Sequence, residues 1–227
     1  MRKLKNCTAF ILLAVLASCS NQETPKEKPG AQLAANDTRL KEDTYLIPSG
    51  GSTGILFKKG TSVTFTEGKG QVEEGTLAAD TYLFPVSGKS SFLFAANSVV
   101  TFSTKEKGKV ESGVLAKDSY IFPVGGKTAM LFKAASQVVF DPIEGDKVSS
   151  GVIAEDTYIE PVGSTAGVLF KGGTSVFFVL GEAGKLRKGT LAKDTYLYAA
   201  NNPSAVLYKS GTAVNFDDAG KVSASKN

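Results

Sequence analysis

The sequence predicts an all-β domain in which five units of about 38 residues form a tandem array of antiparallel β-hairpins. Three observations support this fold class. A ten-residue segment, GTLAKDTYLY at Gly189 to Tyr198, recurs in five versions along the chain. Two aromatic positions follow each version at constant spacing. The runs between turn residues are short and rich in β-branched and aromatic residues, without sustained helical periodicity.

Residues 1–18 have the pattern of a signal peptide and are excluded from the fold. Three basic residues, Arg2, Lys3 and Lys5, precede an apolar run from Thr8 to Leu16. This run is too short to span a hydrocarbon core of about 30 Å as a permanent helix.

The next segment, Leu16 to Cys19 (LASC), resembles the bacterial lipobox. The resemblance implies cleavage before Cys19 and attachment of a diacylglyceryl group to its thiol, with further acylation such as palmitate. Two or more acyl chains hold a protein stably on a membrane. We therefore expect a lipoprotein of the bacterial cell envelope that is periplasmic or surface-exposed. Its expected anchor is the outer membrane in preference to the inner one.

Residues 19–36 comprise this cysteine and a polar tether. The segment is rich in Pro, Lys and Glu and has no periodicity, which is typical of a disordered chain. We expect it to hold the folded domain, residues 37–227, clear of the lipid headgroups.

Composition excludes several classes of function. Apart from Cys7 in the signal peptide and Cys19, the chain has no cysteine, and it has no histidine. Disulfides within the domain, cysteine-based metal sites and histidine-based catalysis are therefore excluded. Without the three bases of the signal peptide, 23 Lys and Arg face 22 Asp and Glu, so no binding surface for nucleic acid is indicated.

The motif Asp-Thr/Ser-Tyr aligns the five units. Its tyrosines are Tyr45, Tyr82, Tyr120, Tyr158 and Tyr196. Twelve residues after them stand Phe57, Phe94, Phe132, Phe170 and Tyr208, and eight residues further on stand Phe65, Phe102, Phe140, Phe178 and Phe216. The approximate unit boundaries are 38–75, 75–112, 113–150, 151–188 and 189–227. One such unit is too small to bury a core of its own, so neighbouring units are expected to stack.

Each unit is predicted to contain four short strands, arranged as two related hairpins. In the third unit these strands are Lys109 to Ala116, Ser119 to Val124, Ala129 to Ala134 and Gln137 to Asp141. The connections are too short for parallel crossovers, so neighbouring strands are expected to be antiparallel. A five-bladed β-propeller is the alternative architecture, because four strands also make a small blade.

Comparison between the units predicts which side chains face the core. The constant positions are the aliphatic residue after each tyrosine, the leucine before the first repeated aromatic, and the valine two residues before the second. The residue between that valine and the second aromatic varies, as Thr64, Thr101, Val139, Phe177 and Asn215. Alternation places the constant positions inside and the variable ones outside.

A tight turn is predicted three residues after the first repeated aromatic. The turn positions are Gly60, Asn97, Ala135, Gly173 and Gly211. Gly and Asn tolerate left-handed backbone, whereas Ala does not, so a strained or different turn is expected at Ala135.

The segments after the second aromatic resemble bacterial MORN-type repeats. Examples are FSTKEKGKVESGVL (Phe102 to Leu115) and FDDAGKV (Phe216 to Val222). They share the order aromatic, Gly-Lys-Val/Leu and, where the segment continues, Gly-x-Leu. The resemblance implies a run of β-hairpins that serves as an interaction or structural surface. The chain has no Trp, and its units are longer than those of the family.

The motif Asp-Thr/Ser-Tyr repeats a carboxylate, a hydroxyl and a phenol five times. Turn chemistry explains the first two, because these side chains bond nearby backbone groups, and the tyrosines are expected to form an aromatic ladder between units. The alternative is a row of calcium sites at Asp43, Asp80, Asp118, Asp156 and Asp194. Calcium needs several oxygens at each site, and no acidic loop supplies them, so no metal or cofactor is predicted.

Two sets of side chains are candidates for contact with a partner. The first is the set of outward apolar residues Phe122, Val139, Phe177 and Tyr198, which mark a partner surface if they are contiguous, unless a second layer buries them. The second is a basic stripe of Lys58, Lys133, Lys171 and Lys209. Such a stripe suits anionic glycans or lipid headgroups, and it also protects a sheet edge from aggregation.

No nucleophile elbow, phosphate-binding loop or metal-ligand spacing is present, so no enzyme is predicted. The predicted function is a non-catalytic protein-interaction or structural module of the cell envelope. Its partners are the lipid membrane, through acylated Cys19, and an unidentified envelope protein. The alternative is binding of peptidoglycan or an anionic polysaccharide through the tyrosines and lysines.

Overall fold

The computed structural model describes residues 38–223, and all its regular elements are β-strands. The predicted signal peptide, Cys19, the tether and residues 224–227 lie outside the described residues. Between residues 38 and 223 the chain forms no helix long and apolar enough to cross a membrane.

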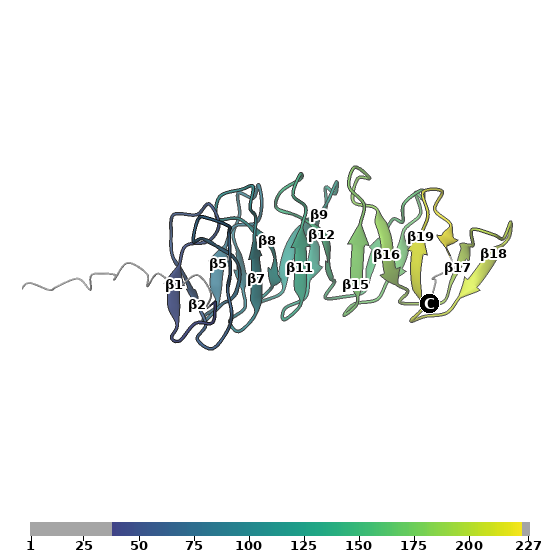
Figure 1. Cartoon of the computed structure of the whole chain (residues 1–227). Helices are drawn as coiled ribbons and strands as arrows, with labels where there is room; N and C mark the ends of the chain where they lie inside the picture. Colours follow the sequence, from purple (N-terminus) through teal and green to yellow (C-terminus); the bar gives the residue numbers. More distant parts are fainter. Residues whose placement is uncertain (1–37, 224–227) are drawn as a thin grey trace, which may run out of the picture. The chain divides into compact units, whose positions relative to one another are not determined.

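Each unit begins with a two-stranded antiparallel hairpin (Figure 1). The five hairpins are β1 (Thr44–Leu46) with β2 (Ile55–Phe57), β5 (Thr81–Leu83) with β6 (Phe92–Phe94), β9 (Ser119–Pro123) with β10 (Met130–Phe132), β13 (Thr157–Ile159) with β14 (Val168–Phe170), and β17 (Thr195–Tyr198) with β18 (Ala205–Tyr208). β-Branched and aromatic residues dominate these strands, as a pleated and half-buried surface favours.

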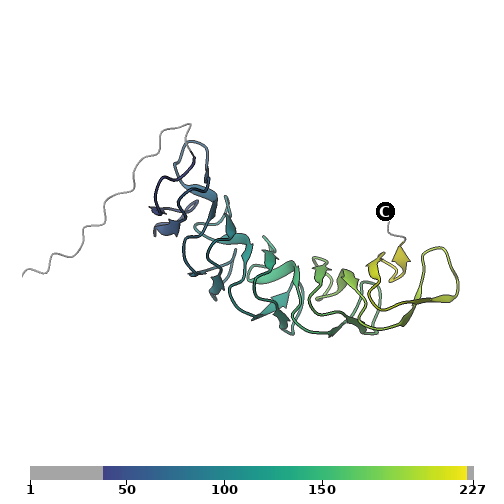
Figure 2. The ribbon, with the colours of Figure 1, turned by 90° about the horizontal axis from the view of Figure 1, so that it is seen from below.

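The other two strands of each unit join one long antiparallel sheet, hereafter the long sheet. Its strands in spatial order are β3 (Thr64–Phe65), β4 (Val72–Thr76), β7 (Val99–Phe102), β8 (Val110–Val114), β11 (Gln137–Phe140), β12 (Lys147–Val152), β15 (Ser175–Phe178), β16 (Leu186–Thr190), β19 (Ala213–Phe216) and β20 (Val222–Ser223). This order follows the chain, and Figure 2 shows the same progression in its colours. The all-β array of antiparallel hairpins, with two hairpins in each unit, is therefore confirmed.

The strand order excludes the five-bladed propeller. The long sheet runs through all five units without closing, so no unit has a separate blade.

The structure also contains parallel contacts that the sequence did not predict. In the second unit, for example, Val110 donates its N–H to the Phe84 carbonyl and accepts from Val86 N–H, both at 2.9 Å. Pro85 lies between these partners and needs no donor there, which explains a proline at this position.

The core lies between the hairpins and the inner side of the long sheet. Its largest members include four fully buried rings at the first repeated aromatic position, Phe57, Phe94, Phe132 and Phe170. Each ring lies against a glycine of the long sheet. A Cβ atom on Gly75, Gly113, Gly151 or Gly189 would be 2.6–2.7 Å from a ring carbon. The glycine that opens the repeated segment is therefore required by close packing.

Neighbouring units are tied together by rings and by backbone hydrogen bonds. The Phe57 ring packs edge-on against Phe102 of the next unit, with centroids 6.3 Å apart, and the same contact recurs between Phe94 and Phe140. Ala78 N–H, of the second unit, donates to the Leu56 carbonyl, of the first, at 3.0 Å. Aromatic pairs of this kind contribute roughly 0.5–1.5 kcal/mol beyond burial of area. The predicted stacking of units is confirmed.

The turn after the first repeated aromatic has left-handed backbone in all five units. Its φ values are +72° at Gly60, +61° at Asn97, +54° at Ala135, +74° at Gly173 and +83° at Gly211. Ala135 therefore adopts the same turn as the glycines and is strained, as one of the two expectations had it. The hydroxyl of Ser136 donates to the Lys133 carbonyl at 2.5 Å and helps to fix this turn.

Replacing Ala135 with glycine is expected to stabilise the domain by about 0.5 kcal/mol, because relief of the left-handed strain outweighs the entropy that glycine adds to the unfolded chain. Urea unfolding followed by circular dichroism measures the change. Gly173→Ala is the matched control at the equivalent position and is expected to destabilise. A loss of stability in Ala135→Gly contradicts the assignment of strain.

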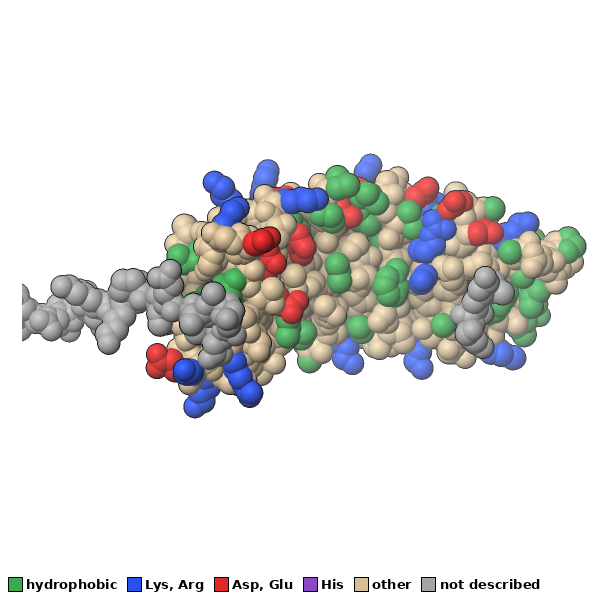
Figure 3. All heavy atoms as spheres, viewed as in Figure 1, with side chains coloured by type: hydrophobic (Ala, Val, Ile, Leu, Met, Phe, Trp, Pro, Cys, Tyr) green, Lys and Arg blue, Asp and Glu red, His purple; other side chains and the backbone are tan. Residues whose placement is uncertain are grey.

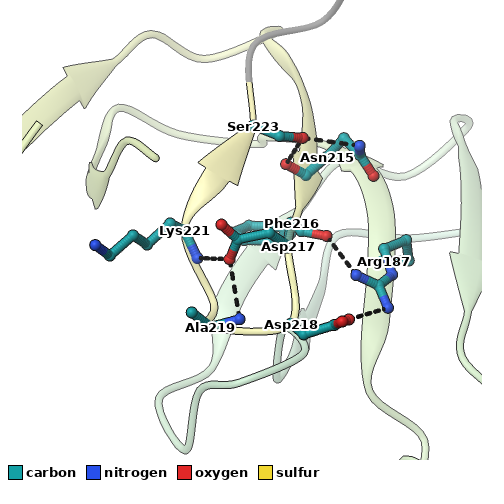
Figure 4. Close-up of polar contacts among 8 residues, drawn as sticks. All are labelled: Arg187, Asn215, Phe216, Asp217, Asp218, Ala219, Lys221 and Ser223. Atoms are coloured by element: carbon teal, nitrogen blue, oxygen red, sulfur yellow. Dashed lines mark hydrogen bonds and ion pairs between the residues drawn. The ribbon is translucent and has the colours of Figure 1, made fainter. Parts of the chain in front are cut away.

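The turn between β19 and β20 is fixed by side chains (Figure 4). Asp217 Oδ1 accepts hydrogen bonds from the N–H groups of Ala219 (3.0 Å) and Lys221 (2.8 Å). From β16, Arg187 donates to the Phe216 carbonyl at 2.9 Å and to Asp218 Oδ1 at 2.7 Å. The equivalent Asp141 accepts from Ile143 and Glu144 N–H, so short polar side chains cap this turn in more than one unit.

Candidate functional site

A row of exposed tyrosines follows the outer side of the five hairpins. Tyr45, Tyr82, Tyr120, Tyr158 and Tyr196 are 59–70 % exposed. Each tyrosine is the second residue of the first strand in its hairpin. Side chains alternate along a strand, so the next residue, such as Leu83 or Ile121, points into the core. The expected aromatic ladder is wrong, since no tyrosine among the described residues packs against another.

Each tyrosine has a leucine directly opposite on the partner strand. The pairs are Tyr45–Leu56, Tyr82–Leu93, Tyr120–Leu131, Tyr158–Leu169 and Tyr196–Leu207. Residues directly opposite in an antiparallel pair share a face, so these leucines also lie on the outer side and are at most half-buried. The prediction that they face the core is therefore wrong. We call these five Tyr–Leu pairs the hairpin face.

The position two residues after each tyrosine extends the hairpin face. It holds Ile47, Phe84, Phe122, Glu160 and Tyr198. Phe122 and Tyr198 are 43 % and 57 % exposed, as their outward positions predicted. Only the fourth hairpin has a charged residue here.

The two other predicted contact residues lie elsewhere. Phe177, 44 % exposed on β15, and half-buried Val139, on β11, are on the outer side of the long sheet, across the core from the hairpins. The structure thus divides the four predicted residues between two faces. Lys188 Nζ lies 5.8 Å from the centroid of the Phe177 ring and partly covers it.

Lysines border the hairpin face. The predicted stripe, Lys58, Lys133, Lys171 and Lys209, occupies the residue after the second hairpin strand in four of the units. Figure 3 shows Lys and Arg side chains following one another along one edge of the molecule. The hydrogen bond from Lys209 Nζ (2.8 Å) and that from Ser210 N–H hold the pKa of Asp194 below its ordinary value.

Two further lysines, which the sequence did not single out, contact the tyrosines. Lys117 Nζ lies 3.3 Å from the hydroxyl oxygen of Tyr82 and 5.6 Å from its ring centroid. Lys193 has the same relation to Tyr158, at 2.9 Å and 5.1 Å. In both cases the lysine comes from the following unit and lies over the ring, as a cation–π contact requires.

The repeated aspartates hold the hairpins closed. One oxygen of each carboxylate accepts a backbone N–H from the turn sixteen residues later, at 2.6–2.9 Å. In the third unit the pair is Asp118 and Ala134, and the Ser119 hydroxyl donates to the Lys117 carbonyl. Within residues 38–223 no three Asp, Glu, Cys or His side chains are grouped closely enough to hold a metal ion. These bonds support the structural interpretation of the motif.

A groove of about 530 Å³ separates the third and fourth hairpins. Tyr120 and Leu131 line it from the third hairpin, and Tyr158, Glu155 and Glu160 line it from the fourth unit. The groove therefore opens on the hairpin face between two tyrosines.

One end of this groove is held by close backbone packing. A Cβ atom on Gly125 would be 2.7 Å from Ala183 N, in the turn between β15 and β16. Hydrogen bonds from Lys147 Nζ (3.0 Å) and Gly125 N–H (2.6 Å) hold the pKa of Glu144 below its ordinary value. The carboxylate of Glu144 thus fixes the loop at Gly125, which lines the groove.

No protein-family model, curated protein or solved structure matches the chain. The side chains of the hairpin face and the groove are therefore the basis on which a function is inferred.

Proposed function

We propose that this protein is a lipid-anchored component of the bacterial cell envelope that acts as a non-catalytic protein-interaction module. The observation that carries this proposal is the row of five tyrosines, each at least 59 % exposed at an equivalent position. The anchor is acylated Cys19, and the hairpin face is the contact surface.

Exposed tyrosines favour protein contacts for a physical reason. A tyrosine side chain offers a large apolar area and a hydroxyl while it loses little rotamer entropy on binding. Tyr is also enriched among the residues that dominate binding free energy at interfaces. Here every tyrosine stands opposite a leucine that is at most half-buried, so five apolar patches repeat along the array.

The simultaneous replacement of Tyr82, Tyr120 and Tyr158 by serine is expected to reduce cross-linking to envelope proteins at least tenfold. A tenfold loss of affinity corresponds to a loss of only about 1.4 kcal/mol of binding free energy. The full lipidated chain is cross-linked in its own cells, and its partners are identified by mass spectrometry. A matched control places serine at Phe177, on the opposite side of the core, and is expected to keep the partners. Unchanged partners in the triple variant contradict the proposal.

The alternative function, binding of an envelope glycan, is favoured by one observation. Lys117 and Lys193 place a cation beside an exposed tyrosine ring, and a ring with a neighbouring cation suits a sugar that carries an anionic group. Sedimentation with purified peptidoglycan distinguishes the two functions. Glycan binding that is lost in the same triple variant would replace the protein-interaction proposal by this alternative.

A further inference from the structure

Two acidic residues of the fourth unit line one groove. Glu160 stands where the other units have an apolar or aromatic residue, Ile47, Phe84, Phe122 or Tyr198. Glu155 stands where the neighbouring third and fifth units have Lys117 and Lys193, whereas the first and second units have Glu42 and Ala79. Both carboxylates line the groove between the third and fourth hairpins, together with Tyr120. Two acidic side chains of one unit thus line the same groove.

The lysine contacts at the neighbouring tyrosines show what the groove lacks. Tyr82 and Tyr158 each have a lysine from the following unit over the ring, at 5.6 Å and 5.1 Å from the centroid. At Tyr120 the residue in that position is Glu155, and the ring is 68 % exposed. The chain therefore supplies a cation to two tyrosines and a carboxylate to the one between them.

Carboxylates and lysines are equal in number around the groove, so the attraction for a cation depends on Glu155. Glu155 forms no ion pair with any described residue. Glu160 Oε2 lies 3.4 Å from Lys185 Nζ but remains half exposed, and Lys127 lines the same groove. An aromatic ring beside a carboxylate attracts a guanidinium or ammonium group both by cation–π attraction and by opposite charge.

We propose that the groove between the third and fourth hairpins binds an arginine or lysine side chain of an extended segment of a partner protein. The cation lies over Tyr120, as Lys117 lies over Tyr82, and pairs with Glu155, while Leu131 contacts the aliphatic part of the side chain. This inference rests on the proposed function, because it assigns the chemistry of the partner at one part of the hairpin face.

The experiment uses the full chain in detergent and a capped peptide, Gly-Gly-Arg-Gly-Gly, titrated by calorimetry and by NMR. The same peptide with citrulline, which is neutral and has nearly the same shape, is the matched ligand. The arginine peptide is expected to bind at least about tenfold more tightly than the citrulline peptide, because the cation supplies both attractions. Equal binding of the two peptides overturns the inference.

A second arm returns the fourth unit to the pattern of its neighbours. Glu155→Lys is expected to place a lysine over Tyr120 and to weaken binding of the arginine peptide at least about tenfold. Glu67→Lys, at an exposed turn of the first unit, makes the same change of charge away from the groove and is expected to bind normally. Thermal unfolding verifies that both variants are folded. Equal weakening by both variants overturns the site.

Choline, a quaternary ammonium group without a peptide, is the third ligand. Binding of choline more tightly than of the arginine peptide overturns the choice of a protein segment and assigns the groove to a small cation or lipid headgroup. The proposed function is tested separately by the cross-links of the triple tyrosine variant. If those cross-links are lost while the arginine peptide does not bind, the proposed function stands and this inference fails.

Discussion

Replacing Phe132 with alanine is expected to destabilise the domain by about 3–5 kcal/mol, because a fully buried ring leaves a cavity that its surroundings fill only in part. Phe132 is the last residue of β10, and its ring packs on the long sheet at Gly151. Its residue also forms a bridge with Ile153 in the following unit. The loss therefore affects the hairpin and the junction between two units.

Urea unfolding followed by circular dichroism measures this effect. Tyr120→Ala, in the same hairpin, removes another large aromatic side chain, but one that is mostly exposed. It is expected to cost less than about 1 kcal/mol. Similar losses in the two variants would mean that the ring of Phe132 is not a principal part of the core.

Replacing Gly151 with alanine is expected to destabilise the domain by about 2–3 kcal/mol through overpacking. The new Cβ would lie 2.7 Å from Phe132 Cδ1 and 3.2 Å from Val138 Cγ1. Both neighbours are fully buried and cannot move into solvent. The backbone of Gly151 is not left-handed, so the cost arises from space alone.

Two comparisons test this explanation by urea unfolding. Gly167→Ala places its Cβ 3.7 Å from Tyr158 Cβ, an ordinary contact, and is expected to be neutral or stabilising. Adding Phe132→Leu to Gly151→Ala is expected to cost about 1 kcal/mol less than the sum of the two single changes, because a smaller side chain relieves the clash. Strict additivity would show that the glycine is required for another reason.

Internal repetition made most of the fold predictable from one sequence. Constant spacing of the aromatics gave the unit, and alternation around Val138 and Phe140 correctly gave the inner side of a strand. The prediction that Leu131 faces the core is wrong, because an unchanging residue type in all five units does not by itself mean burial. A residue can also be constant because it lies opposite a constant tyrosine on the same outer surface. The register of the two hairpin strands decides which residues lie opposite each other, and the repeat pattern does not indicate that register.

The candidate site was predictable only in part. The exposure of Phe122 and Tyr198 followed from alternation along a strand, which is local information. The groove is lined by both Tyr120 and Glu155, although they are 35 residues apart in the chain. The signal that could have indicated it was the acidic pair of the fourth unit, because Glu160 replaces an apolar or aromatic residue and Glu155 replaces the lysine of the third and fifth units.

The pairing of successive units in the long sheet has a consequence for how such a chain changes over generations. β4, β8, β12 and β16 each pair with the next unit through the same register, glycine opposite valine. Unequal recombination between two copies would therefore delete or add a whole unit and still leave every junction correctly matched. The number of hairpins can change in single steps, and a new specificity can arise in one copy while the others keep the old one.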